Sequence, residues 1–420
     1  MVSMKPRTML IALVLGTVSG LLVNTLAAGA PWVDWVVNNV ATTVGQIFIR
    51  LLFMLVVPLL FSALVMGITE LDLKQLGRIG GRTLAYTISV SFVAVMVGLV
   101  LVNVLKPGEG APESLRTLAH ANSNAIKVAP APMDQSPAGI IVNMVPDNIV
   151  KAAANGDMIG VIIFAIIVGI ALTRTRTEGA RRLQEVMQGI YDVAMTCIGG
   201  VMRLAPLGVG ALLFAMTARL GTGPLKQVAA YVGVVMLGLL FHCFVVYSIL
   251  LRTLGRTSPL VFFRGARLAM ITAFSTASST ATLPTALKVA EENLRIPRHI
   301  SRFVLTVGAT MNQNGTALFE GVTVLFLAQL YGVHLGLGQQ TLVMFICVLA
   351  GVGTAGVPAA SMPVIAMILG LFGIPPEGIG LILGFDRLLD MSRTTLNVTG
   401  DLVLAVCVAG GEQEPEATSV

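Results

Sequence analysis

The feature that most constrains this chain is a series of apolar runs long enough to cross a lipid bilayer. The first extends from about Thr8 to Ala28, close to the roughly 20 residues that a helix needs for one crossing. Further runs predict spans over 41–69, 83–105, 138–173, 185–218 and 227–251. Because no water is present at that depth to satisfy backbone groups, the spans must be helical. We therefore predict an all-α polytopic membrane protein.

Composition supports this class and excludes others. Hydrophobic residues make up 55% of the chain and charged residues 11%, with a mean hydropathy of +0.86. The net charge of +6 comes from basic residues between apolar runs, where membrane topology explains them, so a nucleic-acid-binding protein is excluded. The four cysteines have no paired spacing for a metal site, a redox pair or a disulfide framework. A membrane enzyme is least favoured, since the sequence offers no nucleophile with a base and no metal cluster.

The basic residues predict how the chain is oriented in the membrane. Three clusters follow the second, fourth and sixth runs: Lys74, Arg78 and Arg82; Arg174, Arg176, Arg181 and Arg182; and Arg252, Arg256, Arg264 and Arg267. The positive-inside rule places these clusters in the cytoplasm. The loop from Lys106 to Pro137 is then external, and the acidic tail from Glu412 to Val420 is internal. We expect a multi-pass protein of the cell (inner) membrane with cytoplasmic N- and C-termini.

Two interrupted apolar runs follow Arg267. The first, Ile271–Lys288, is broken by hydroxyl residues and has basic residues on both sides, which predicts a re-entrant hairpin entered from the cytoplasm. The second, Gln340–Phe372, is broken at Gly351–Pro358 and lacks nearby basic residues, which predicts a hairpin entered from outside. Each hairpin precedes a span with a polar centre. Such inverted repeats bring broken helices together near the midplane, where we expect the site.

The two polar-centred spans differ in character. The span 302–331 contains Asn312–Thr316, too polar for lipid, and we expect the helix to unwind there. The last span, 376–409, carries polar residues at spacings of four, three, four and four, which places them on one helical face: Asp386, Asp390, Arg393, Asn397 and Asp401. Ion pairs within the helix, Asp390 with Arg393 or Asp386 with Arg387, are the structural alternative. For the last three residues a substrate or ion path is favoured.

The chemistry of these groups suggests a ligand. Arg393 can hold a carboxylate through two hydrogen bonds, and Asp390 can hold an ammonium group. Carboxylate and amide oxygens of the kind that an alkali cation prefers are supplied by Asp401, Asn312 and Asn397. The inferred ligand is an acidic amino acid. Hydroxyls of Ser278 and Ser279 suit an α-carboxylate, although membrane serines often bond neighbouring carbonyls instead.

Glu320 lies one helical turn beyond Thr316 in an apolar context. Burial disfavours the charged form of a carboxyl, so this group can carry a proton at neutral pH. A protonated structural carboxyl bonded to a neighbour explains it equally well, and both interpretations stay open.

These motifs resemble the dicarboxylate/amino acid:cation symporter family, which includes archaeal aspartate transporters and mammalian excitatory amino acid transporters. The likeness covers nearly the whole chain. It is carried by Phe48–Pro58 (FIRLLFMLVVP), Ser278–Pro284 (SSTATLP) and, most specifically, Asp390–Asp401 (DMSRTTLNVTGD). It implies a homotrimer with eight transmembrane helices and two re-entrant hairpins in each protomer. It also implies an elevator mechanism, in which a mobile domain carries substrate across.

The resemblance implies a division into domains. Residues 1–82 (helices 1 and 2) and 138–226 (helices 4 and 5) would form the scaffold, and 106–137 an external loop. Residues 83–105 (helix 3) and 227–410 would form the transport domain, followed by a cytoplasmic tail, 411–420.

The resemblance also implies roles for single residues. Arg393 matches the ligand of the side-chain carboxylate and Asp390 that of the amino group. Further substrate contacts match Thr316, Thr394 and Asn397, with Ser279 and Val357 at the two hairpin tips. One sodium site matches Gly308, Asn312, Asn397 and Asp401, and a second matches Thr310 with carbonyls near Gly351, Val352 and Thr354. Glu320 matches the glutamate to which proton coupling is assigned in mammalian members.

Some positions depart from the family pattern. The unwound helix usually reads Asn-Met-Asp-Gly-Thr, but Asn314 replaces the aspartate that serves a third sodium site. The hydroxyl partners of that site on helix 3 become Thr87, Val90 and Ser91, so one hydroxyl is missing as well. Members also carry an extra arginine at positions that are Ala277 or Met391 here, for which Arg387 is a candidate substitute.

We therefore expect a secondary active symporter that imports glutamate or aspartate with sodium, with protons as a further candidate coupling ion and no cofactor. The expected partners are the acidic amino acid, sodium, the bilayer and two further copies of the chain. A C4-dicarboxylate symporter is the main alternative, disfavoured by Asp390 because it would repel a ligand without an ammonium group. An anion channel or a substrate sensor on the same fold is the alternative from another class.

Overall fold

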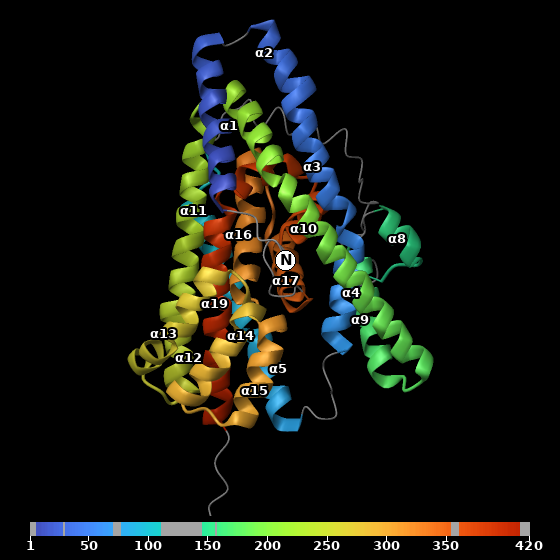
Figure 1. Cartoon of the computed structure of the whole chain (residues 1–420), viewed down its shortest axis with the longest axis vertical. Coiled ribbons are helices and arrows are strands. Elements are labelled where there is room, and N and C mark those ends of the chain that lie inside the picture. The colour runs from blue at the N-terminus through green and yellow to red at the C-terminus, as the bar shows by residue number, and fades with distance from the viewer. Residues whose placement is uncertain are drawn as a thin grey trace, which may run out of the picture.

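The computed structural model describes residues 6–27, 30–69, 77–110, 145–155, 158–353 and 361–411. Helices joined by short turns make up these residues, and no strand occurs among them (Figure 1). The predicted all-α fold is therefore confirmed. The tail after residue 411 and most of the external loop, 111–137, lie outside the described residues.

The N-terminal half is organised around one long helix, Glu178–Leu220. Its elements are α1 (Pro6–Ala27), α2 (Pro31–Val36), the π-helical turn Val37–Ala41, α3 (Thr42–Met54), α4 (Val56–Thr69), α5 (Gly77–Leu105), α8 (Ile149–Asn155), α9 (Met158–Arg174) and α10 (Glu178–Leu220). Helices α1 and α3 pack against α10, and α4 packs against α9 at one edge of the molecule (Figure 1). The span predicted over 138–173 is two helices, α8 and α9, in its described part. The span predicted over 185–218 begins earlier, at Glu178, and bends by 49° between Val201 and Arg203, close to Pro206.

The C-terminal half contains the two hairpins and the broken helix. Its elements are α11 (Gly223–Phe241), a π-helical turn (His242–Val246), α12 (Tyr247–Thr253), α13 (Pro259–Thr276), α14 (Ser279–Lys288), a second π-helical turn (Val289–Asn293), α15 (Arg298–Met311), α16 (Asn314–Tyr331), α17 (Leu337–Gly353), α18 (Ser361–Leu371), a 3-10 turn (Pro376–Gly378) and α19 (Ile379–Gly410). The first hairpin starts at Pro259, well before the expected Ile271, because Arg264 and Arg267 lie inside its first arm. Helices α17 and α18 are the arms of the second hairpin, whose tip, 354–360, lies outside the described residues.

Local backbone geometry explains the two interruptions that are described. At the first hairpin, Ala277 has a left-handed conformation (φ 49°) that ends α13, and the Ser278 hydroxyl accepts a hydrogen bond from Ala281 N and caps α14. In the broken helix, Asn312 (φ −98°, ψ 69°) and Gln313 (φ −100°, ψ 51°) leave the helical region. The break is shorter than the expected Asn312–Thr316, because the helix resumes at Asn314.

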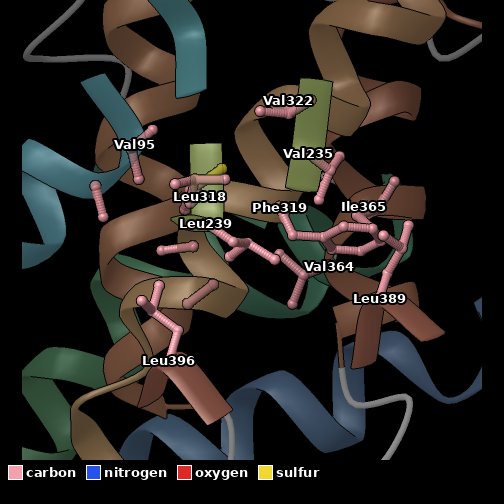
Figure 2. Close-up of a cluster of buried hydrophobic side chains, with 14 of the residues drawn as sticks. Val95, Val235, Leu239, Leu318, Phe319, Val322, Val364, Ile365, Leu389 and Leu396 are labelled. Carbon is pink, nitrogen blue, oxygen red and sulfur yellow. The ribbon is translucent and has the colours of Figure 1, made fainter. Parts of the chain in front are cut away.

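The apolar core is centred on α16, which is buried on nearly all sides. Figure 2 shows Leu318, Phe319 and Val322 of this helix among side chains from four other helices. The neighbours labelled there are Val95 of α5, Val235 and Leu239 of α11, Val364 and Ile365 of α18, and Leu389 and Leu396 of α19. A helix that is apolar all round belongs in the interior of a bundle. This packing fixes the polar start of α16 in the middle of the protein.

Helix length and composition support membrane spans in the described residues. Two helices, Ile79–Leu105 and Leu225–Thr253, are long and apolar enough to cross a bilayer, and the bent pair within α10 makes a third if it counts as one span. Shorter apolar helices are Ile11–Ala27, Val57–Met66, Ile163–Arg174 and Leu337–Gly351. The remaining core helices are interrupted or carry charges at their centres, which fits a polar site enclosed by a bundle.

Candidate functional site

The polar face predicted for the last helix is present and buried. In α19 the side chains of Asp386, Asp390, Arg393, Asn397 and Asp401 are all shielded from solvent. Each of these residues follows the previous one by three or four positions, so helical geometry places them in a row. The row faces the broken helix α15–α16 and the hairpin arm α18, which supply its hydrogen-bond partners.

Arg393 is the centre of a buried ionic cluster. Its Nη2 lies 2.9 Å from Asp386 Oδ1 and 3.0 Å from Asp390 Oδ1, and its Nη1 donates to Ser361 Oγ at 2.7 Å. The guanidinium carbon is 3.9 Å from the ring centre of Phe319, a cation–π contact. Its Nε has no partner among the described residues, although the side chain is only 1% exposed. The Nε donor of the arginine is therefore left for a ligand.

One of the two ion pairs considered as the structural alternative is present in the cluster, and the other is not. Asp390 does pair with Arg393, but Asp386 pairs with Arg393 as well and not with the adjacent Arg387. Two carboxylates around one guanidinium give a formal charge of −1. A buried excess of negative charge is costly unless a further cationic group neutralises it. The cluster therefore suits a ligand that carries an ammonium group together with a carboxylate.

Asn397 links the last helix to the broken helix. Its Oδ1 accepts a hydrogen bond from Gly315 N at 2.7 Å, and its Nδ2 donates to Gln313 Oε1 at 2.6 Å and to Thr316 Oγ1 at 3.2 Å. Thr316 and Asn397, both predicted, are thus brought together, whereas the prediction missed Gln313. The signal was its place inside the polar break. Thr394 is also buried on α19.

A second polar group surrounds Asp401. Asn312 Nδ2 donates to Asp401 Oδ1 at 2.9 Å, while Asn312 Oδ1 is buried without a hydrogen-bond partner in the described part of the chain. The buried ion pairs found among the described residues both belong to Arg393, so no cationic side chain neutralises Asp401 in them. An unneutralised carboxylate beside an unpartnered amide oxygen is a donor set that fits an alkali cation.

Gly308, also predicted, lies beside this group. An added Cβ on Gly308 would stand 2.5 Å from Asp401 Oδ1, so only glycine leaves room for the carboxylate there. Thr310 is half-buried and donates its hydroxyl to Val307 O at 2.9 Å. Gly351 of α17 is buried, and a Cβ added to it would stand 3.6 Å from Gln313 O. Thr354, Val357 and the side chain of Val352 fall outside the described residues.

Asn314 has its carboxamide bonded at both ends. Its Oδ1 accepts from Ser91 Oγ at 2.6 Å and its Nδ2 donates to the Tyr247 hydroxyl at 3.0 Å. The Tyr247 hydroxyl in turn donates to Leu396 O at 3.3 Å. This network ties α5, α12, α16 and α19 together without any charge. It supplies no carboxylate of the kind that the resemblance associates with a third cation.

Glu320 is fully buried, and neither of its carboxyl oxygens has a hydrogen-bond partner in the described part of the chain. It follows Phe319, the ring that lies under the Arg393 guanidinium. The structural interpretation required a hydrogen-bonded neighbour, and the described residues contain none.

The ends of four helices add fixed partial charges to the site. Helices α14 and α16 begin at the hairpin tip and at the break, with Ser279 buried in the first turn of α14, and their amino ends favour anions. Helices α15 and α17 end at Met311 and Gly353, and their carbonyl ends favour cations. The interruptions of these helices therefore provide helix ends that favour anions and helix ends that favour cations.

A helical bundle whose interrupted helices enclose a buried, charged site defines a class of protein, the secondary transporters. The sequence model of the sodium:dicarboxylate symporter family matches residues 7–410, which is nearly the whole chain. The chain belongs to the sodium:dicarboxylate symporter family, a family of membrane transporters.

Several relatives are similar over most of their length. The chain is 36% identical over 383 residues to the proton/glutamate-aspartate symporter of Escherichia coli (strain K12), covering 91% of this chain and 87% of the relative. It is 32% identical over 402 residues to the proton/sodium-glutamate symport protein of Geobacillus stearothermophilus, covering 95% and 93%. It is also 32% identical over 396 residues to an excitatory amino acid transporter of Caenorhabditis elegans, covering 85% and 78%.

Proposed function

We propose that this protein is a secondary active symporter that imports acidic amino acids, glutamate or aspartate, together with cations. The observation that carries the proposal is the buried Arg393 held between Asp386 and Asp390. The names of the relatives, which are glutamate and aspartate symporters or excitatory amino acid transporters, agree with it.

The charge balance of the site favours an acidic amino acid over a plain dicarboxylate. The side-chain carboxylate of the substrate binds Arg393, whose Nε lacks a partner, and the ammonium group binds Asp390. The α-carboxylate meets the amino end of α14 at Ser278 and Ser279, with Thr394 on the facing helix. Succinate would bring two carboxylates and no ammonium group to a cluster that already carries a negative charge.

Sodium is the first coupling ion of the proposal. One ion binds Asp401, Asn312 and Asn397 beside Gly308, and a second binds Thr310 near the carbonyl end of α17, which includes Gly351 and Val352. The proposal also assigns Thr354 to the second ion site and Val357 to the substrate site. The neutral network around Asn314 leaves no third sodium site of the family type. Binding of sodium and of substrate is then coupled reciprocally.

Protons are the second coupling ion of the proposal, and Glu320 carries them. An apolar site disfavours the charged form of this unpartnered carboxyl group, which follows Phe319, the ring that contacts Arg393. The two bacterial relatives carry names that include protons, alone or with sodium.

The proposed architecture has eight transmembrane helices and two hairpins per protomer of a homotrimer in the cell (inner) membrane, with both termini cytoplasmic. The hairpins are α13–α14 and α17–α18, and α15–α16 counts as one broken span. The scaffold comprises 1–82 and 138–226, and the transport domain, 83–105 and 227–410, moves as an elevator. Helices α5 and α11, which the proposal assigns to the transport domain, begin at Gly77 and Gly223.

Uptake into proteoliposomes tests the function. Purified protein is reconstituted, and uptake of labelled aspartate and glutamate is measured with sodium and pH gradients imposed separately. Concentrative uptake that requires an inward sodium gradient supports the symporter. Binding without concentrative uptake would indicate a sensor, and substrate-independent anion flux alone would indicate a channel.

A further inference from the structure

Gln313 occupies the centre of the break between α15 and α16 and is 3% exposed. None of the roles given above to the substrate, sodium or proton sites uses its side chain. Its carboxamide nevertheless contacts two residues to which a substrate contact was assigned, Asn397 and Thr316. Gln313 is therefore in direct contact with the candidate substrate site.

The direction of the Gln313 carboxamide is fixed by its neighbours. Its Nε2 donates to Ala309 O at 3.1 Å in the last turn of α15, so its Oε1 must face α19. The direction of Asn397 is fixed in the same way, because Gly315 N donates to its Oδ1 and its Nδ2 must then be the donor. The 2.6 Å contact between Asn397 Nδ2 and Gln313 Oε1 is therefore a hydrogen bond of defined polarity.

This bond uses the donors that a substrate carboxylate needs. A carboxamide nitrogen has two N–H groups, and those of Asn397 point to Gln313 Oε1 and to Thr316 Oγ1 at 3.2 Å. The Thr316 hydroxyl donates to the same Gln313 oxygen at 3.4 Å. Both side chains thus direct their protons at an acceptor that belongs to the chain itself.

We infer that Gln313 sets the substrate affinity as an internal competitor, because its Oε1 takes the hydrogen bonds of Asn397 and Thr316 that a carboxylate oxygen of the substrate takes on binding. This inference rests on the proposed function. A carboxylate is a stronger acceptor than a carboxamide oxygen, so the exchange favours the substrate, yet each binding event must first release Gln313. The backbone of Gln313 lies against Gly351, so this release occurs beside the second hairpin.

Two substitutions by side chains of similar length distinguish a Gln313 that competes with the substrate from a Gln313 that only supports the site structurally. Gln313→Met keeps the volume but removes the acceptor, so the Asn397 amide is left for the substrate alone, and we expect the Kd for aspartate to fall about tenfold. Gln313→Glu keeps the shape but places a charged acceptor there, which holds Asn397 more tightly and repels a carboxylate. We expect its Kd to rise by at least about tenfold.

Gln329 offers a matched control on the same helix. It is half-buried at the far end of α16, where it donates to Val102 O at 3.1 Å and accepts from Gly108 N at 3.2 Å. Gln329→Met makes the same chemical change away from the site, and its Kd for aspartate should equal that of the parent.

The experiment measures aspartate and glutamate binding to purified protein by calorimetry at saturating sodium, together with thermal unfolding of the ligand-free protein. Gln313→Met should bind more tightly and yet unfold at a lower temperature, since it lacks an internal hydrogen bond. If Gln313 only supported the structure of the site, Gln313→Met would lower both the affinity for aspartate and the unfolding temperature. Weaker binding in both Gln313 variants, or unchanged binding in both, overturns the inference. A parent protein that binds neither amino acid overturns the proposed function and this inference with it.

Discussion

Arg393 and Asp386 lie seven residues apart on α19 and form a buried ion pair, with Nη2 of the arginine 2.9 Å from Oδ1 of the aspartate. Asp390 binds the same nitrogen, and Ser361 of the second hairpin binds the other terminal nitrogen. The guanidinium is therefore oriented by the protein before a substrate arrives. Pre-orientation of this kind lowers the entropic cost of binding a carboxylate.

Replacing Arg393 should change the class of substrate. Arg393→Cys removes the positive charge that balances the side-chain carboxylate and leaves Asp386 and Asp390 without a partner. Acidic substrates should lose about 3–5 kcal/mol of binding free energy, and neutral amino acids should gain relative to them. Competition binding with aspartate, glutamate and serine checks this result. Unchanged affinity for both acidic amino acids in the purified variant would show that the arginine does not contact the substrate.

Succinate should compete poorly with aspartate in the parent protein. The two ligands differ chiefly in the ammonium group, which the proposed function assigns to Asp390, a partner of Arg393 in the buried cluster. Displacement of labelled aspartate by succinate and malate measures the difference in affinity between aspartate and the dicarboxylates. Asp390→Asn should reduce this difference, because it removes the repulsion between the Asp390 carboxylate and a dicarboxylate. If both dicarboxylates displaced aspartate from the parent at concentrations similar to that of aspartate itself, the C4-dicarboxylate alternative would replace the proposal.

Asp401→Asn should weaken the dependence of substrate binding on sodium. Asp401 is the charged group of the site around Asn312, whose Oδ1 lacks a partner among the described residues. Without the carboxylate, the site cannot offset the desolvation of a cation, so the sodium concentration should shift the aspartate Kd less than in the parent. Titrations of aspartate at several sodium concentrations measure this linkage. A variant that keeps the parent's sodium dependence would place the cation elsewhere.

Gly308→Ala should weaken the same site by steric pressure. The added Cβ would stand 2.5 Å from Asp401 Oδ1, so the carboxylate must move and its cation geometry is lost. We expect about a tenfold rise in the sodium concentration for half-maximal binding. Gly233→Ala is the control, because α11 leaves open space there and nothing lies within 4 Å of the added atom. Equal sodium affinity in the two variants would argue against a cation beside Gly308.

Glu320→Gln should abolish the response of uptake to a pH gradient. The carboxyl group of Glu320 is fully buried without a partner among the described residues and can carry a proton through the transport cycle, whereas a glutamine cannot. In the parent, an inward proton gradient should accelerate aspartate uptake into proteoliposomes. A variant whose uptake keeps the parent's pH response would assign Glu320 a structural role.

The neutral network of Asn314 leads to a prediction about the number of coupled sodium ions. Since Ser91 and Tyr247 occupy its carboxamide, no charge is present to bind a third cation there. Reversal-potential measurements should then give fewer than three sodium ions for each substrate. A value of three would require a site that these residues do not form.

The helical class and the row of polar groups on the last helix could be predicted from the sequence alone. Apolar runs of membrane length allow only helices, because backbone groups in lipid must bond within their own segment. The row from Asp386 to Asp401 followed from helical periodicity, which is a local property. Polar, hydroxyl and glycine residues inside apolar runs also located the first hairpin and the break near Asn312, since such residues interrupt a helix in lipid only at a polar site.

The partners of these groups within the protein depend on the tertiary structure. Gln313 and Asn397 are 84 residues apart in sequence, and only the packing of α16 against α19 makes them partners. The same holds for Arg393 and Ser361, and for Asn314 with Ser91. Basic residues predict a start of the first hairpin after Arg267, but α13 begins at Pro259 and contains both Arg264 and Arg267, so its start could not be predicted from charge. Periodicity fixes which face of a helix is polar, whereas the partner of each polar group depends on how distant helices pack.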